Sequence, residues 1–231
     1  MRVVAGSSPV TPTSIDIENY EILPMKILIF GDSIVWGAWD RELGWAYRLK
    51  KYLDNKTLDS NFNSYYETHV LGVSGDTTED LLKRFIPEIE VRASSDEKLL
   101  IIFAIGINDS LLELDNKKNQ VSLEKFNQNI KELISQAKKF SSDILFLGFT
   151  PVDESKVNPI PWHPKCAYTI ESAKAFDNTL KKICNENSVA YLEVAQSLSI
   201  LNLEDGIHPN TEGHKKIFNS VRNSLKNQKK V

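Results

Sequence analysis

A regular alternation of short apolar runs with amphipathic segments begins at residue 25 and constrains the fold of this 231-residue chain more than any other feature. The run Leu99–Ile105 contains no polar residue, which is typical of a strand covered on both faces. Four further strand-like runs occupy 26–30, 65–71, 144–149 and 189–194. Strands that alternate with helices predict a parallel five-stranded sheet with helices on both faces, in a three-layer α/β/α sandwich.

Apolar residues at helical spacing separate these runs. In segment 77–91 they recur at every fourth position, and Thr77 is placed to cap the helix with Asp80 at its third position. Pro87 is expected to kink or shorten this helix because proline lacks the N–H that an interior position needs. Further helices are expected around 45–53, 123–134, 176–183 and 217–225.

The first 24 residues differ from the rest, because glycine, serine, threonine and proline dominate part of them and periodicity is weak. We expect residues 1–24 to form a loosely ordered extension and residues 25–231 to form one domain. The only long irregular stretch expected inside that domain is Thr150–Tyr168, which contains four prolines. The N-terminus has no apolar core like that of a secretion signal, so a cytoplasmic location is expected.

Composition excludes several classes of protein. The 28 basic and 31 acidic side chains give a formal net charge of −3, which disfavours a general nucleic-acid binder. No apolar run approaches the roughly 18 residues of a membrane span. The two cysteines, Cys166 and Cys184, are far from any zinc-binding spacing and are expected to be reduced thiols.

Polar and glycine-rich segments follow each predicted strand, where ligands bind in open α/β sheets. These segments are Gly31–Ser33, Gly72–Thr77, Gly106–Asp109, Thr150–Asp153 and, after a short insertion, Asp205–Pro209. A hydroxyl, glycine backbones, an amide and an Asp/His pair are the components of an acyl-transfer site. The sequence therefore predicts that these segments converge at one edge of the sheet.

Ser33 is the candidate nucleophile, although a serine in this position also fits a plain helix N-cap. His208 is the candidate base, because Asp205 lies three residues before it and can orient its ring. The remaining histidines fit this role less well: His69 lies inside a strand, His163 in the proline-rich stretch and His214 on an apolar helix face.

Gly75 and Asn108 are the candidate oxyanion donors, together with the Ser33 backbone N–H. Glycine lets a backbone N–H approach a substrate oxygen closely, and an asparagine amide donates a second bond. Three tryptophans in loops expected to border the site, Trp36, Trp39 and Trp162, are candidates for the walls of a substrate pocket, with ordinary packing as the alternative. The loop aspartates Asp32, Asp76 and Asp109 are expected to tie loops together through backbone N–H groups.

Together the four blocks Gly31–Ile34, Gly72–Thr77, Gly106–Asp109 and Asp205–Pro209 resemble those of the SGNH, or GDSL, hydrolases, over roughly residues 25–225. The resemblance implies a flavodoxin-like five-stranded sheet and a Ser33–His208–Asp205 triad. It implies oxyanion donors from Ser33, Gly75 and Asn108. It also implies hydrolysis of a small-molecule ester or thioester with no metal and no cofactor.

The expected function is thus that of a serine esterase, with short-chain acyl or acetyl esters as the expected substrates. A lysophospholipase or acyl thioesterase that takes longer chains is one alternative. A second is a Mg²⁺-dependent phosphoryl-transfer enzyme that uses Asp32, with further oxygens from Asp76, Asp109 and Asp153. A third is a binding domain without catalytic activity.

Overall fold

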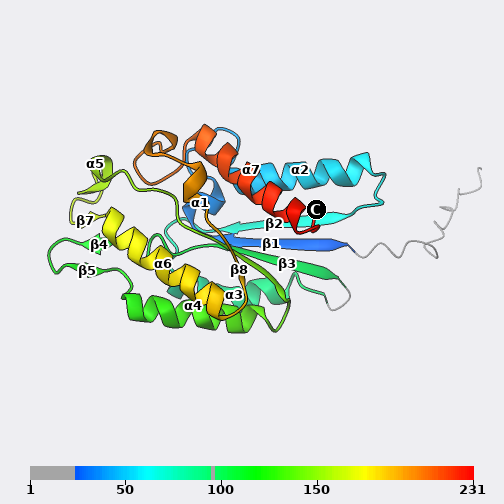
Figure 1. The fold of residues 1–231 in the computed structure, drawn as a ribbon, viewed down its shortest axis with the longest axis horizontal. Coiled ribbons are helices and arrows are strands. Elements are labelled where there is room, and N and C mark those ends of the chain that lie inside the picture. The colour runs from blue at the N-terminus through cyan, green and yellow to red at the C-terminus, as the bar shows by residue number, and fades with distance from the viewer. Residues whose placement is uncertain (1–23, 95–96) are drawn as a thin grey trace, which may run out of the picture.

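The computed structural model describes residues 24–94 and 97–231, built around a five-stranded parallel sheet (Figure 1). Of the expected extension at residues 1–24, residues 1–23 lie outside the described residues. The strand order is β2-β1-β3-β6-β8, which corresponds to the flavodoxin-like order 2-1-3-4-5. The strands are β1 (Met25–Gly31), β2 (Tyr66–Gly72), β3 (Lys98–Ala104), β6 (Asp143–Leu147) and β8 (Ala190–Leu192). The predicted α/β sandwich with a parallel sheet is confirmed.

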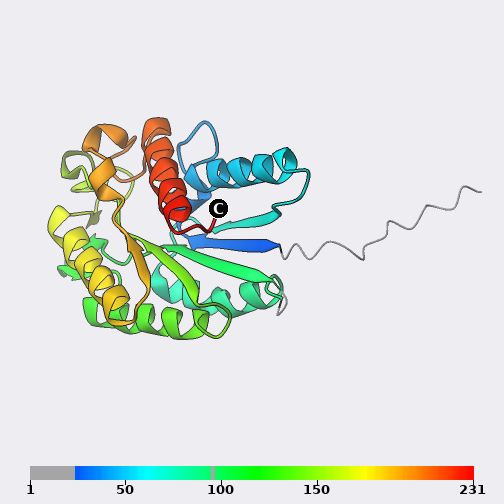
Figure 2. The same ribbon diagram turned by 45° about the vertical axis from the view of Figure 1, so that its right-hand side comes forward.

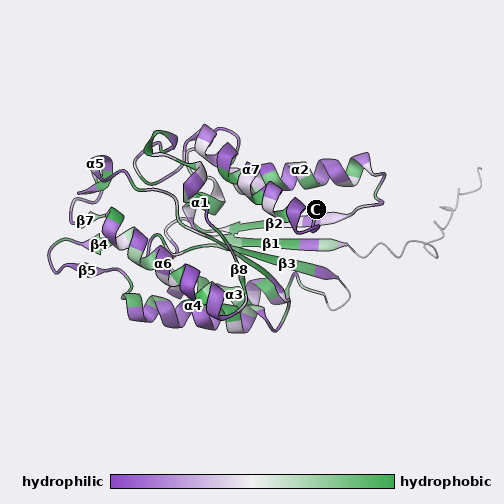
Figure 3. Ribbon diagram, viewed as in Figure 1, coloured by the Kyte–Doolittle hydropathy of each residue, from purple (hydrophilic) through white to green (hydrophobic). Residues whose placement is uncertain are grey.

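Helices cover both faces of the sheet, as the two views in Figures 1 and 2 show. On one face lie α2 (Trp45–Asp59) and α7 (Thr211–Asn227), which contact each other. On the other lie α3 (Thr78–Glu90), α4 (Leu123–Ala137) and α6 (Ile170–Glu186), which pack in that order. The central strands are the most apolar part of the ribbon in Figure 3, whereas the helices alternate between apolar and polar residues. This pattern is what a sheet buried between two helical layers requires.

Aromatic rings on adjacent strands form the centre of the core. Phe103 of β3 stacks on Phe146 of β6 with ring centroids 4.7 Å apart, and on Phe30 of β1 at 5.8 Å. Phe85 of α3 packs on the edge of this stack. All four rings are fully buried. The core therefore fixes the relative positions of β1, β3 and β6, and the first two of these strands lead directly into Ser33 and Asn108.

The start of α3 is the helix terminus that the sequence predicted most closely. The Thr77 side chain accepts from the Asp80 backbone N–H, and the Asp80 carboxylate accepts from the Thr77 N–H, which completes a capping box. The helix continues past Pro87 to Glu90, so of the two expected effects, a kink or a shortening, the proline does not cause the shortening. Pro87 cannot donate the backbone hydrogen bond of an interior helical residue. The apolar face of α3 is buried on the sheet, and this packing stabilises the helix without that bond.

Several small elements had no periodicity from which to predict them. Two-residue strands form a second, antiparallel sheet: β4 (Leu112–Glu113), β5 (Lys118–Asn119) and β7 (Cys166–Ala167). The stretch expected to be irregular contains β7 and a short helix, α5 (Glu154–Val157). Cys166 and Cys184 are both buried thiols. No helix within the described ranges is long and apolar enough to cross a bilayer.

Candidate active site

Ser33 begins α1 (Ser33–Trp36), a four-residue helix directly after β1. The N-cap of this helix is Asp32, whose carboxylate accepts from the Ile34 N–H at 2.9 Å, so the N-cap role considered for Ser33 is taken by its neighbour. The helix lies against the end of β2, where a Cβ on Gly72 would come within 2.3 Å of the Trp36 nitrogen. Glycine at this position therefore lets the helix begin close to the sheet edge.

A chain of three hydrogen-bonding side chains joins the two ends of the sequence. Ser33 Oγ lies 2.9 Å from His208 Nε2, although the residues are 175 positions apart. His208 Nδ1 lies 2.7 Å from Asp205 Oδ2. The other carboxylate oxygen of Asp205 accepts from the backbone N–H groups of Ile207 and His208 at 3.1 and 2.9 Å. The residues predicted as nucleophile, base and acid are thus brought together in the order that proton transfer needs.

Asp205 is held as a carboxylate by its surroundings. Burial alone would raise its pKa, but the hydrogen bonds from the His208 ring and backbone outweigh burial and hold the pKa of Asp205 well below its ordinary value. An ionised Asp205 can only accept at Oδ2, so the proton between the two groups resides on His208 Nδ1. His208 Nε2 then presents its lone pair to the hydroxyl of Ser33.

The two candidate oxyanion donors other than Ser33 lie on the loops after β2 and β3. Gly75 has φ +85°, and a Cβ built on it would meet nothing within 4 Å, so its backbone borders open space. Asn108 is buried, and its Nδ2 donates to the Asp76 carbonyl at 2.9 Å while its Oδ1 accepts from the Tyr168 hydroxyl at 2.7 Å. These two bonds fix which way the amide faces.

Tyr168 contacts the site, although no feature of the sequence indicated it. It ends the stretch that was expected to be irregular, and its neighbours on the chain carry no motif. Its ring is buried, and burial together with the negative charges of Asp32 and Asp205 raises the pKa of its hydroxyl. The raised pKa keeps the Tyr168 hydroxyl protonated as the donor to Asn108 Oδ1.

The other histidines lie away from this chain of bonds. His214 of α7 is fully buried, accepts from the Trp45 N–H at Nδ1 and therefore donates from Nε2 to the Ala38 carbonyl, at 3.1 Å. His69 bonds Glu67 on β2 at 2.6 Å. His163 forms an isolated bridge with Ile160 in the loop before β7.

The loop aspartates each bond to a different protein partner. Asp109 accepts from the backbone N–H and hydroxyl of Thr78, as expected for a loop tie. Asp76 instead pairs with the Arg84 guanidinium at 2.7 Å. Asp153 caps α5. In the part of the chain that the structure describes, no group of three or more His, Cys, Asp or Glu side chains is arranged to hold a metal ion.

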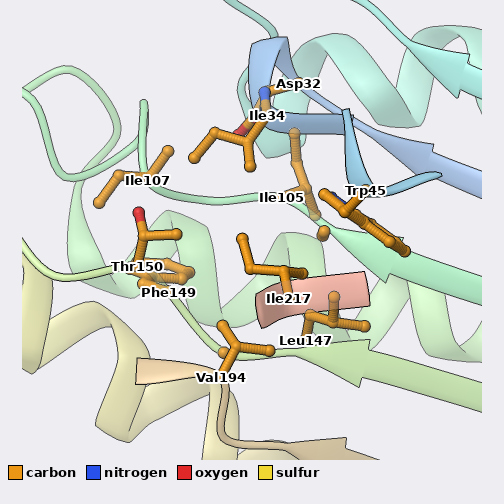
Figure 4. A pocket seen from close by; sticks show the side chains of 12 residues that line it. Asp32, Ile34, Trp45, Ile105, Ile107, Leu147, Phe149, Thr150, Val194 and Ile217 are labelled. Carbon is orange, nitrogen blue, oxygen red and sulfur yellow. Dashed lines mark hydrogen bonds between the residues drawn. The ribbon is translucent and has the colours of Figure 1, made fainter. Parts of the chain in front are cut away.

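Asp32 borders a small apolar cavity beneath the start of α1 (Figure 4). The cavity has a volume of about 30 Å³, and side chains such as Ile34, Trp45, Phe149 and Ile217 line it. Only 2 % of Asp32 is exposed, and this burial raises its pKa from the ordinary 3.8 to about 7, against the lowering effect of the Ile34 N–H. The cavity is too small for a substrate, and the apolar surroundings that bury Asp32 make it a weaker acid than usual.

We expect Asp32→Asn to gain stability relative to the wild type as pH rises from 5 to 8. Between pH 3.8 and about 7 the folded protein retains a proton on Asp32 that the unfolded chain releases, so this group makes folding less favourable as pH rises through that window. Asparagine has no proton to lose. Urea unfolding at several pH values measures the difference in unfolding free energy between the two proteins.

Asp80→Asn is the matched control for this measurement. The pKa of Asp80 is lowered to about 2 by its bonds to Lys83 and Thr77, so this group is ionised in both states throughout the window. Its effect on stability should therefore stay constant from pH 5 to 8. A constant difference for Asp32→Asn as well would show that Asp32 is ionised in the folded protein.

The tryptophans divide into three groups. Trp36 and Trp39 are more than half exposed and line one surface hollow of about 480 Å³, together with Leu43 and Tyr47. The indole Nε1 of Trp39 also donates to Asp205 Oδ2 at 2.8 Å. Trp162 is exposed on the loop before β7 and is not among the residues that line this hollow. Trp45 is fully buried at the start of α2, as packing predicts.

Comparisons with known proteins agree on one family. The model of the GDSL-like lipase/acylhydrolase family matches residues 29–216 of this chain. The isoamyl acetate-hydrolyzing esterase 1 homolog of Homo sapiens is 24% identical over 218 residues, which cover 85% of this chain and 79% of the human protein. The Bos taurus protein of the same name is 24% identical over 224 residues.

Solved structures share the fold at low sequence identity. A lipase/acylhydrolase from Enterococcus faecalis superposes with a TM-score of 0.68 at 17% identity, over 88% of this chain and 96% of that protein. An acetylxylan esterase from Geobacillus stearothermophilus superposes with a TM-score of 0.65 at 17% identity, over 87% and 93%. With the family match spanning most of the chain, we conclude that this protein belongs to the GDSL-like lipase/acylhydrolase family and is a hydrolase that acts on ester bonds.

Proposed function

We propose that the protein is a serine esterase in which Ser33 is the nucleophile, His208 the general base and Asp205 the acid that orients the base. The observation that carries this proposal is the unbroken set of contacts from Asp205 through His208 to Ser33, at 2.7 and 2.9 Å. Distances of this size are within reach for proton transfer between a nucleophile and its base. The lowered pKa of Asp205 supports its role as a permanent anion beside the ring.

The reaction would proceed through a covalent acyl-enzyme. Ser33 Oγ attacks the ester carbonyl carbon while His208 Nε2 takes the hydroxyl proton, and the carbonyl π electrons move onto oxygen. The tetrahedral intermediate collapses as His208 returns the proton to the departing alcohol oxygen, which leaves the acyl group on Ser33. Water, activated by His208 in the same way, then attacks the acyl carbon and releases the carboxylic acid and Ser33.

Three donors are proposed to stabilise the negative oxygen: the backbone N–H groups of Ser33 and Gly75 and one N–H of Asn108. The positive φ of Gly75 and the open space beside it support a close approach of substrate. Since one Asn108 N–H already bonds the Asp76 carbonyl, the second is the one proposed to face the oxyanion. Tyr168 supports this assignment, because its hydroxyl keeps the amide from turning over.

The proposed substrates are small carboxylic esters with an acetyl or other short acyl group. Two relatives are named for acetate esters, a human isoamyl acetate-hydrolyzing esterase homolog and a bacterial acetylxylan esterase. The hollow lined by Trp36 and Trp39 is of a size that suits a small ligand. We propose that these two indoles form a wall of the substrate pocket. Trp162 does not line this hollow, so it is not part of the proposed wall.

A panel of p-nitrophenyl esters from acetate to palmitate, with an acyl-CoA and an acetylated sugar, tests the substrate class. We expect kcat/KM to be highest for acetate or butyrate and to fall for longer chains. We expect Trp36→Ala to raise KM several-fold and to change the ranking, because removing the indole widens the hollow. A preference for palmitate or for the acyl-CoA would favour the lysophospholipase or thioesterase alternative.

Two controls make the result interpretable. Trp162→Ala removes an equally exposed indole outside the hollow, and should keep the wild-type ranking. The panel is repeated with EDTA, which should leave the rates unchanged for a serine mechanism and abolish them for the Mg²⁺ alternative. If Trp36→Ala and Trp162→Ala change the ranking equally or not at all, the proposed pocket wall is wrong.

A further inference from the structure

We propose that Trp39 is a positioning residue for the reaction: its indole N–H holds the Asp205 carboxylate in the orientation in which it bonds His208. This inference rests on the proposed triad and adds a fourth side chain to it. Trp39 was considered above only as a wall of the substrate pocket. Its contacts point to a second role, one that acts through Asp205 and does not require contact with substrate.

The bonds around Asp205 show what Trp39 contributes. Its Nε1 donates at 2.8 Å to Oδ2, the same oxygen that accepts from His208 Nδ1 at 2.7 Å. Two backbone N–H groups occupy the other oxygen, Oδ1. Trp39 and His208 are thus the two side chains that donate to Oδ2. Together with the two backbone donors at Oδ1, they leave the carboxylate little freedom to rotate about its Cβ–Cγ bond.

The Trp39 ring also covers the base. It stands nearly perpendicular to the His208 ring, at 82° with centroids 5.9 Å apart, which is a favourable T-shaped arrangement. One side chain therefore contacts both the acid and the base. These two contacts tie the acid and the base to one ring.

The backbone of Trp39 is clamped on both sides in a strained conformation. Its φ is +64°, in a region that tryptophan rarely adopts. The preceding carbonyl, that of Ala38, accepts from the buried His214. The following side chain, the carboxylate of Asp40, accepts from the Gly44 N–H at 2.9 Å and pairs with Arg48. Contacts on both sides of Trp39 therefore hold its backbone in place.

Burial does not account for this construction, because Trp39 is 58% exposed. A positive φ in a non-glycine residue is unfavourable and persists only where its surroundings impose it. The contacts that the conformation secures are those to Asp205 and His208. The strain is therefore best understood as the cost of aiming the indole N–H at the carboxylate.

The experiment compares Trp39→Phe with the wild type on p-nitrophenyl acetate. Phenylalanine keeps an aromatic ring beside His208 but has no N–H. We expect kcat to fall about tenfold, the size of effect expected when a bond to a charged group is lost. KM should change less than kcat. The acid limb of the kcat/KM profile should move to higher pH, because a carboxylate with one donor fewer stabilises the protonated ring more strongly.

A double-mutant cycle with Asp205→Asn separates this role from a merely structural one. If Trp39 acts through the carboxylate, adding Trp39→Phe to Asp205→Asn should cause no further loss. Trp36→Phe provides the comparison within the same hollow and should alter KM without moving the pH midpoint. Thermal unfolding checks that each variant is folded.

The outcomes distinguish this inference from the proposed function. An unchanged kcat and pH profile in folded Trp39→Phe, or full additivity with Asp205→Asn, would overturn the positioning role while leaving the triad intact. Activity that persists in Ser33→Ala would instead overturn the proposed function, and the positioning role with it. A tenfold loss that disappears in the Asp205→Asn background would establish both.

Discussion

Ser33→Ala is expected to lower kcat by about a millionfold, with KM for a p-nitrophenyl ester changed little. The hydroxyl is the group proposed to form the bond to the acyl carbon, and alanine leaves His208 with no proton to take. Labelling by a fluorophosphonate probe should disappear in the same variant, because the probe reacts with an activated serine oxygen. Steady-state rates and gel fluorescence after labelling measure the two effects independently.

The matched control for this prediction is Ser74→Ala, at an exposed serine on the loop after β2, at the same edge of the sheet. It should keep both hydrolysis and labelling. Because Ser33 is 5 % exposed and lies at the start of α1, unfolding of the Ser33→Ala variant is followed by circular dichroism. Normal labelling of a folded Ser33→Ala protein would mean that the nucleophile lies elsewhere.

Asp205→Asn is expected to lower kcat on the order of ten-thousandfold while the fold is kept. The two backbone donors at Oδ1 would hold the amide oxygen of the asparagine, which places the NH₂ group at Oδ2 and leaves the Trp39 N–H there without its acceptor. That NH₂ would donate to His208 Nδ1, so the ring proton moves to Nε2. His208 would then face Ser33 with an N–H and could not accept the hydroxyl proton.

Proton NMR of the imidazole N–H groups, with solvent isotope effects on kcat, checks this explanation. The downfield resonance of a His208 Nδ1–H bonded to a carboxylate should be lost in the variant. Glu204→Gln removes a neighbouring carboxylate that has no bond to the His208 ring among the described residues, and should keep wild-type rates. Rates for Asp205→Asn within tenfold of the wild type would contradict the proposed role of the carboxylate.

The sequence predicted the sheet and the meeting of Ser33 with His208 for one physical reason. Each motif follows an apolar run, and parallel strands whose crossovers are right-handed bring their carboxyl ends to one edge. The N-cap at Thr77 was also predictable, because it bonds Asp80, only three residues along the chain. Features that depend only on periodicity or on neighbours in the chain were thus predictable.

The contacts that refine the site depend on tertiary structure, and the sequence did not predict them. Tyr168 meets Asn108 across 60 positions, and Trp39 meets Asp205 across 166. Neither pair has a spacing or composition that would mark it. The hydrogen bond from His214 to the Ala38 carbonyl is a similar case. The apolar helix face that carries His214 indicated burial, but it did not indicate the acceptor. Such bonds depend on how distant elements pack against one another, which spacing and composition along the chain do not indicate.

The distance in sequence between Ser33 and His208 has a consequence for biosynthesis. The ribosome makes the hydroxyl of the proposed pair 175 positions before the imidazole. A nascent chain in which His208 has not yet left the ribosome therefore carries the proposed nucleophile without its activator. Such a chain should be inert toward cellular esters until the His208 loop has folded onto the sheet edge.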